Sequence, residues 1–240
     1  LNKCCAKLVY FCPMTLTIAI PLVAVILGVL ITDFGAKKVS KFKQLLLGFS
    51  GSFLLSITLI ELLPNLFEQE LDRRLISLII LGGILLQMIL ESFSKGAEHG
   101  HAHLNESDGF AGFVLIFSAL FVHAFIEGIP LDGEKHLLLA VSLHKVPIAM
   151  ILYTLALKAN LSKIQAFSTL ILFGLITPLG SLITHLEWVI TYTPYLNALS
   201  AGIFLHVGAI ILFESEKCHR FNLARIVMVL LGMLLAYLIG

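Results

Sequence analysis

The chain has 240 residues, of which 58% are hydrophobic and only 13% are charged. Soluble domains are about 45–50% apolar and about 25% charged, so this composition excludes an ordinary soluble domain and indicates a membrane protein. The formal net charge is +1 and no run of basic residues is present, which predicts that the protein has no nucleic-acid partner.

Eight apolar stretches are long enough to cross a bilayer as helices, which takes about 20 residues each. They lie approximately at residues 8–32, 44–66, 75–93, 110–131, 137–157, 164–186, 195–214 and 222–240. None shows the alternating pattern of a membrane barrel strand, and the connections between them are short. We therefore predict an all-α integral membrane protein, with residues 1–240 forming a single transmembrane domain.

Lysine and arginine are concentrated in the loops that follow odd-numbered spans. Those loops hold Lys37, Lys38, Lys41, Lys43, Lys95, Lys158, Lys163, Lys217, Arg220 and Arg225. The loops after even-numbered spans hold only Arg73, Arg74 and Lys135. Because positive charge stays on the cytoplasmic side, the odd loops are predicted to be cytoplasmic and both termini to lie outside. The short loops favour a bacterial inner membrane.

The longest predicted cytoplasmic loop, residues 94–109, alternates histidines with small and acidic residues. It contains His99, His101 and His103 in the run SKGAEHGHAHLNESDG. Such a tract is typical of a segment that collects divalent metal ions at low affinity. The alternative is a solvated connector that happens to be rich in histidine.

Two apolar stretches resemble each other. Residues 49–55 read FSGSFLL and residues 200–206 read SAGIFLH, which aligns a Gly, a Phe and a Leu. The two predicted helices run in opposite directions, so the match fits an inverted repeat of the kind found in transporters.

Ionisable residues inside the fourth and fifth spans are the main functional signal, because charge inside a bilayer is costly and must be compensated. His123 and Glu127 are four residues apart and therefore share one face of a helix. His144 is expected at a similar depth on the next, antiparallel helix. Imidazole nitrogen and carboxylate oxygen are suitable ligands for zinc and related divalent ions, so these three residues form the predicted metal site.

Prolines follow both sets of ligands. Pro130 and Pro147 each remove one helical hydrogen bond, which predicts kinks and frees the carbonyls of Ile126 and Leu143 to help coordinate an ion. Pro178 is predicted to kink the sixth helix in the same way.

The sequence also allows other roles for the polar residues inside the spans. Glu127 and Lys145 could neutralise each other as a buried ion pair, with both histidines bonded to backbone. Glu61, near the outer end of the second span, is either an entrance ligand or a residue at the membrane interface. His206 in the seventh span is either a further ligand or a packed histidine.

Several motifs together resemble the ZIP (Zrt/Irt-like) family of divalent-metal transporters. The fourth span carries His123-Ala124-Phe125-Ile126-Glu127-Gly128, the fifth His144-Lys145-Val146-Pro147-Ile148-Ala149, and the sixth Thr177-Pro178-Leu179-Gly180. The second span ends Glu61-Leu62-Leu63-Pro64, and the seventh begins Ser200-Ala201-Gly202-Ile203-Phe204-Leu205. The resemblance covers nearly the whole chain and implies eight helices in a 3+2+3 arrangement, an elevator-type motion and a homodimer.

The resemblance also implies a two-metal site between the fourth and fifth helices, and here the chain departs from the family. The positions of the second-site ligands hold Ala124 and Lys145, and Ile148 replaces a residue that serves the first site. Carried over by position, the first site keeps His123, Glu127 and His144, while Lys145 occupies the vacant second site.

The sequence therefore predicts a non-enzymatic protein that carries Zn²⁺, or Cd²⁺, Mn²⁺ or Fe²⁺, toward the cytosol through a single intramembrane site. Two alternatives are an intramembrane zinc hydrolase and a degenerate, metal-sensing relative. The hydrolase would need a separate general base at the depth of the site, and none is evident.

Overall fold

The computed structural model describes residues 2–35, 39–100, 109–213 and 223–240. Every regular element in these ranges is helical, which confirms the predicted all-α class. The long helices are α1 (Asn2–Phe34), α2 (Val39–Ile57), α4 (Arg73–Ser94), α5 (Gly109–Gly128), α6 (Lys135–Lys158), α7 (Lys163–Ile183), α9 (Thr193–Phe213) and α10 (Leu223–Ile239). The short ones are η2 (Thr58–Leu62), α3 (Leu63–Glu68), η3 (Ala97–His99), η4 (Ile129–Leu131) and α8 (Glu187–Ile190).

By length and composition, seven helices within the described ranges can cross a membrane. They correspond to the first seven predicted spans, so the chain is an integral membrane protein. The eighth predicted span, residues 222–240, corresponds to α10, whose 17 residues make a shorter apolar helix. The count of eight spans, the 3+2+3 arrangement and the inverted repeat stay predictions.

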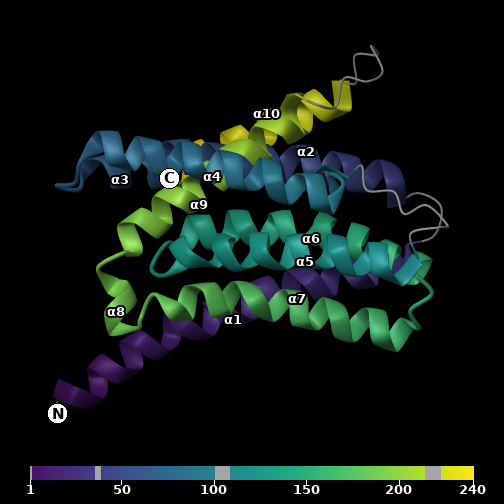
Figure 1. Ribbon diagram of the computed structural model, residues 1–240, viewed down its shortest axis with the longest axis horizontal. Coiled ribbons are helices and arrows are strands. Elements are labelled where there is room, and N and C mark those ends of the chain that lie inside the picture. Colours follow the sequence, from purple (N-terminus) through teal and green to yellow (C-terminus); the bar gives the residue numbers. More distant parts are fainter. Residues whose placement is uncertain (1, 36–38, 101–108, 214–222) are drawn as a thin grey trace.

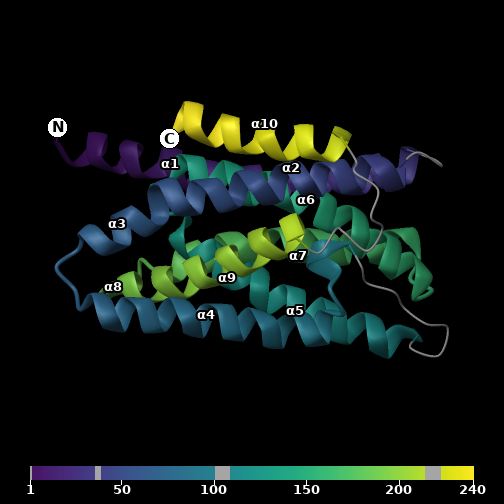
Figure 2. The same cartoon turned by 90° about the horizontal axis from the view of Figure 1, so that it is seen from above.

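The helices lie side by side in three layers (Figure 1). The central layer is formed by α5 and α6. Helices α1 and α7 cover one side of it, and α2, α4, α9 and α10 cover the other. Helix α1 begins and α10 ends at the same end of the bundle, which we call the termini end (Figures 1 and 2). The opposite end holds the segment Lys95–Gly100, which follows α4 and includes η3, and which we call the connector.

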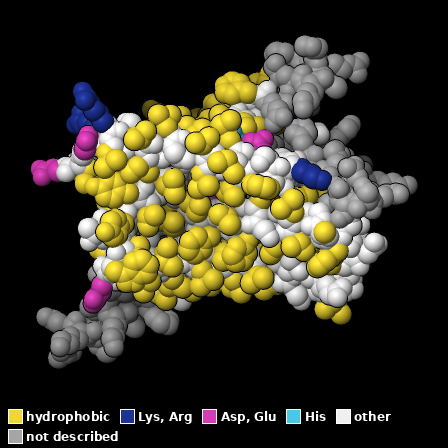
Figure 3. All heavy atoms as spheres, viewed as in Figure 1, with side chains coloured by type: hydrophobic (Ala, Val, Ile, Leu, Met, Phe, Trp, Pro, Cys, Tyr) yellow, Lys and Arg dark blue, Asp and Glu magenta, His cyan; other side chains and the backbone are white. Residues whose placement is uncertain are grey.

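The outer surface is apolar, as lipid contact requires. Hydrophobic side chains cover most of the face in Figure 3, with few charged groups between the two ends. On α4, Leu78, Leu81 and Leu85 are each about 60% exposed, while Ile80 and Gln87 point into the bundle. A polar Gln87 on the buried face of an otherwise apolar helix must find hydrogen-bond partners inside the protein.

Several helix pairs cross at such short range that only glycine fits, among them α4 with α9 and α5 with α7. A Cβ atom on Gly83 of α4 would overlap the carbonyl oxygen of Leu199 on α9, and one on Gly128 of α5 would overlap that of Thr177 on α7. Small residues that let backbones approach closely are the usual means of packing helices in a membrane. The crossing of α5 over α7 fixes the depth of the helix that carries two of the candidate metal ligands.

We expect Gly83→Ala to destabilise the protein by about 1–3 kcal/mol, because the added methyl group meets backbone that cannot move aside without separating α4 from α9. The neighbouring Gly82→Ala is the matched control, since a Cβ at that position has no atom within 4 Å. When thermal unfolding of both variants is measured in detergent, the midpoint temperature should be lower than in the parent for Gly83→Ala alone. Equal midpoints would contradict the close crossing.

Candidate metal site

His123 and Glu127 lie one turn apart on the inner face of α5, as their spacing predicts. Both side chains are almost fully buried, with 2% and 1% of the residue exposed. The helix is apolar on nearly every side, so these two residues are the polar exceptions in its second half. Burial of this kind requires a compensating partner for the carboxylate.

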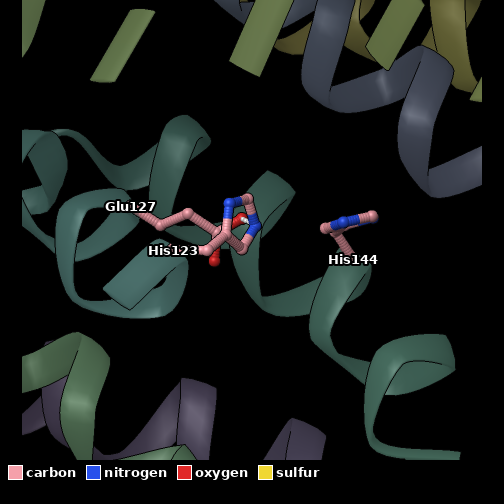
Figure 4. A group of neighbouring side chains, drawn as sticks. All are labelled: His123, Glu127 and His144. Atoms are coloured by element: carbon pink, nitrogen blue, oxygen red, sulfur yellow. Dashed lines mark ion pairs between the residues drawn. The ribbon is translucent and has the colours of Figure 1, made fainter. Parts of the chain in front are cut away.

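His144 of α6 joins them from the neighbouring helix (Figure 4). One nitrogen from each imidazole and one Glu127 oxygen all lie within 4.8 Å of one another. Among the described residues these three form a group of metal-ligating side chains, and all of them are buried. The structure thus brings together the three residues that the sequence predicted as ligands.

The distances suit a first-row divalent ion. In a tetrahedral zinc site with bonds of about 2.0–2.1 Å, neighbouring ligand atoms are about 3.4 Å apart. Nε2 of His123 and Oε1 of Glu127 are 3.0 Å apart, already in this range. The separations in the group are at most 4.8 Å, so the widest would have to close by up to about 1.4 Å when an ion binds.

The contact between His123 and Glu127 is itself a reason to expect a cation there. Nδ1 of His123 contacts the side-chain oxygen of Gln87 at 2.9 Å, so Nδ1 carries the hydrogen and a neutral ring has its lone pair on Nε2. That lone pair faces a carboxylate oxygen 3.0 Å away, and within the described chain neither atom has a hydrogen-bond partner of acceptable geometry. Two facing acceptors are favourable only with a positive charge between or beside them.

Lys145 supplies a permanent positive charge on the other side of the same carboxylate. Its Nζ is 3.2 Å from Oε2 of Glu127 and 4.7 Å from the centre of the Phe173 ring, and the residue is 1% exposed. The ion pair and the cation–π contact together compensate the burial of the ammonium group. Because Lys145 holds Oε2, only Oε1 of Glu127 faces His123 and an incoming metal ion.

The two remaining departures from the family pattern are packed into the core. Ala124 and Ile148 belong to one hydrophobic cluster and are 0% and 2% exposed. The carbonyl oxygen of Ala124 accepts a hydrogen bond from the Thr177 hydroxyl at 2.9 Å. Neither position offers a side-chain metal ligand.

The structure modifies the expected role of the prolines. Pro130 lies in η4, where α5 ends after Gly128, and it leaves the Ile126 carbonyl without its helical donor as predicted. That carbonyl accepts a hydrogen bond from the Ser200 hydroxyl of α9 at 2.9 Å, so it is engaged by protein instead of being open toward an ion. Pro147 and Pro178 lie inside α6 and α7, which both continue past them.

Glu61 lies at the termini end within a π-helical turn, where the Leu63 N–H bonds to the Thr58 carbonyl ahead of Pro64. Such turns often mark functional positions in helices. Oε1 of Glu61 is 2.6 Å from Nδ1 of His136 at the start of α6. Burial and the nearby Glu61 carboxylate raise the pKa of Glu134, with His136 acting in the opposite direction. Glu61 therefore belongs, with Glu134, to an acidic group on the termini side of the buried site, and not to the site itself.

A cavity of about 270 Å³ opens beside this group. It is lined by Leu62, Asn65, Leu66, Gln69, Ile129, Pro130, Asp132, Glu134, Thr184, Ile190, Thr193 and Asn197. Its floor includes the residues that immediately follow α5, so it lies on the termini side of His123 and Glu127.

The other candidate ligands lie toward the connector end or outside the described residues. Nε2 of His206 on α9 is 2.8 Å from Oε2 of Glu91 on α4, and the structure does not group His206 with the three buried ligands. Of the histidine-rich loop, His99 is described only in its backbone, as the last residue of η3, and His101 and His103 lie outside the described residues.

Sequence reasoning missed two buried residues next to the site. They are Gln87 and Glu98, to which the sequence analysis assigned no role, and both are fully buried. Gln87 contacts His123 directly. The available signal was an amide and a carboxylate, Gln87 and Glu91, on one face of a span rich in leucine and isoleucine.

An all-helical membrane bundle with buried nitrogen and oxygen donors at its centre is typical of proteins that move ions across a membrane. A family model described as "ZIP Zinc transporter" matches residues 94–240, more than half of the chain, and includes every helix from α5 to α10. The chain therefore belongs to the ZIP zinc transporter family, whose members are transporters and not enzymes. A comparison with curated proteins gave no match.

Proposed function

We propose that this protein carries Zn²⁺ across a membrane toward the cytosol through one intramembrane site formed by His123, Glu127 and His144. The observation that carries the proposal is the buried contact between Nε2 of His123 and Oε1 of Glu127, with His144 in reach. Three protein ligands with a water in the fourth position make an acceptable zinc site that can also release its ion. Cd²⁺, Mn²⁺ and Fe²⁺ are competing cargo, since the same donors accept them.

Lys145 acts in this proposal as a fixed substitute for a second metal ion. It neutralises Glu127 when no metal is bound and lowers the negative charge that an incoming ion meets. A site with one carboxylate and a neighbouring ammonium should bind zinc more weakly than a site with two acids. Weaker binding favours release on the far side. A degenerate relative that only senses metal would bind zinc at this site without carrying it.

An elevator-type motion fits the way in which the helices pack. In one group α1 packs against α6 and α7, and α5 packs against α7; in the other α2 pairs with α10 and α4 with α9. The two groups meet where α2 contacts α6 and α4 contacts α5. Asp33 of α1 bonds to Tyr153 of α6 and Lys163 of α7, which ties the first group together at one end. In the second group, Arg225 of α10 donates to the Ile211 carbonyl of α9. We propose that the first group, with all three ligands, moves against the second.

The direction of transport rests on the distribution of lysine and arginine, which puts the connector end in the cytosol and the termini end outside. The acidic group around Glu61 and the adjacent cavity would then receive ions from outside. A bacterial inner membrane is proposed from the short loops, and a homodimer from the family resemblance.

The test is uptake of radioactive Zn²⁺ by liposomes that contain the purified protein, compared with liposomes that contain none. Saturable uptake, competed by Cd²⁺, is the expected result. Zinc bound to the folded protein without any flux above the empty liposomes would contradict transport and favour a sensor.

For the entrance, we expect Glu61→Gln to raise the KM for zinc uptake several-fold and to leave the maximal rate unchanged. Removal of the charge lowers the local concentration of cations near the cavity but leaves the buried ligands intact. The concentration dependence of uptake separates the two parameters. If Glu61 only holds α2 against α6 through His136, thermal stability would fall while KM stayed the same.

A further inference from the structure

Gln87 on α4 joins the metal site to the connector. It is fully buried, and its side-chain amide has a polar partner on each side. The oxygen lies 2.9 Å from Nδ1 of His123 on α5, and the nitrogen lies 3.4 Å from Oε1 of Glu98 in η3. Oε2 of Glu98 accepts a hydrogen bond of 2.5 Å from the Ser94 hydroxyl. A continuous buried chain therefore runs from the connector to a candidate zinc ligand.

The chemistry of these groups fixes the direction of every hydrogen bond in the chain. The NH₂ group of the Gln87 amide can only donate, and it faces Oε1 of Glu98, which accepts from it. The amide oxygen must then face His123, and it can only accept from an N–H group. Nδ1 of His123 therefore carries the hydrogen, and the lone pair of the neutral ring is on Nε2, the nitrogen that faces Glu127.

Glu98 can impose this order because the connector is held in a defined position. Lys95, Gly96 and Gly100 all adopt left-handed backbone conformations, with φ of 54°, 71° and 86°, which turn the chain back into the bundle after α4. The short helix η3 then packs against α4, α5, α6 and α9. As a result the carboxylate of Glu98 lies inside the protein, with none of the residue exposed.

We propose that Gln87 is a positioning residue of the metal site, oriented by Glu98, and that docking of the connector determines which ring nitrogen of His123 faces the ion. The inference rests on the proposed function, since it assigns His123 as a ligand. Hydrogen-bond partners behind a ligating histidine generally fix its tautomer and ring orientation.

The same chain also links the two groups of helices. Gln87 belongs to α4, in the group proposed to stay fixed, while His123 belongs to α5, in the group proposed to move. The bond between them can exist only in conformations in which the two groups stand in the present register. Movement of α5, or withdrawal of the connector with Glu98, would break the hydrogen bond to the ring of His123. The ring would then bind the ion more weakly, which favours release of the ion toward the connector end.

The test uses a pair of single variants and their combination. Gln87→Glu alone puts two carboxylates face to face, and Glu98→Gln alone removes the group that orients the amide. In the double variant Gln87→Glu/Glu98→Gln, the new carboxylate accepts from Nδ1 of His123 and from the amide at position 98. The double variant therefore restores the order of donors and acceptors, with the amide and the carboxylate exchanged between positions 87 and 98. Gln87→Leu removes the hydrogen bonds while filling the space.

Two measurements are needed, the tautomer of His123 by ¹⁵N NMR of the metal-free protein, and zinc affinity by equilibrium binding. We expect Nδ1–H in the parent protein, a mixture of tautomers in Gln87→Leu, and a loss of zinc affinity of about 10- to 100-fold in that variant. The double variant should recover both the tautomer and most of the affinity. If Gln87 only filled space, the double variant would not be expected to recover the tautomer or the zinc affinity.

The inference is overturned if Gln87→Leu keeps the parent tautomer and affinity, or if the double variant behaves no better than the single ones. A fall in thermal stability with both readouts unchanged would likewise assign Gln87 a purely structural role. Failure of the proposed function looks different, because the parent protein would then bind or carry no zinc while the tautomer of His123 still responded to Gln87→Leu.

Discussion

Glu127→Gln is expected to reduce zinc uptake to the level of protein-free liposomes. The substitution keeps the size of the side chain but removes the only carboxylate among the three grouped ligands. It also leaves the ammonium group of Lys145 buried without its counter-charge, so this positive charge, neutralised in the parent, would repel the incoming ion. The measurement is the initial rate of radioactive Zn²⁺ uptake at saturating zinc.

Because removing one partner of a buried ion pair costs about 3–5 kcal/mol, the single variant can fail simply by unfolding. The double variant Glu127→Gln/Lys145→Met removes both charges and should regain thermal stability without regaining uptake. Glu68→Gln, at an exposed position of α3, is the matched control for loss of a carboxylate. Substantial uptake by the stable double variant would show that Glu127 is no part of the transport site.

The central features of the site could be predicted from sequence because they depend on local geometry. A spacing of four residues puts His123 and Glu127 on one face of any helix, and a short connection makes α6 the antiparallel neighbour that brings His144 to the same depth. The pairing of Lys145 with Glu127 followed from the high cost of two isolated charges in the same apolar region. These are arguments about single helices or adjacent ones.

What could not be predicted depends on contacts between distant parts of the chain. The Ile126 carbonyl was expected to be available to an ion, but Ser200, far along the chain on α9, donates to it. The contact between Gln87 and His123 depends on how α4 packs beside α5, and the burial of Glu98 depends on three left-handed residues in the connector. Apolar helices carry little information in their sequence about which neighbour each face will meet, since lipid and protein accept the same residues.

The substitution at position 145 gives the second large expected effect. Lys145→Asp, combined with Ala124→Asn, replaces a resident ammonium group by two oxygen ligands at the positions where the family resemblance puts the second-site ligands. Without metal, the introduced aspartate and Glu127 would be two carboxylates in one buried site, which is unfavourable unless a cation lies between them. We therefore expect the double variant to bind about two zinc ions per chain where the parent binds about one, as measured by equilibrium dialysis.

Stability should then depend on metal more strongly than in the parent protein. The parent has Lys145 as an internal cation, so its metal-free form is compensated and zinc stabilises it only through its single site. The double variant should be destabilised by the chelator and stabilised by zinc, by about 2.7 kcal/mol when free zinc is 100 times the dissociation constant. Lys145→Met is the matched control, because it removes the ammonium group without adding a ligand. An unchanged stoichiometry in the folded double variant would mean that Lys145 does not occupy the place of a second ion, and that its role is confined to neutralising Glu127.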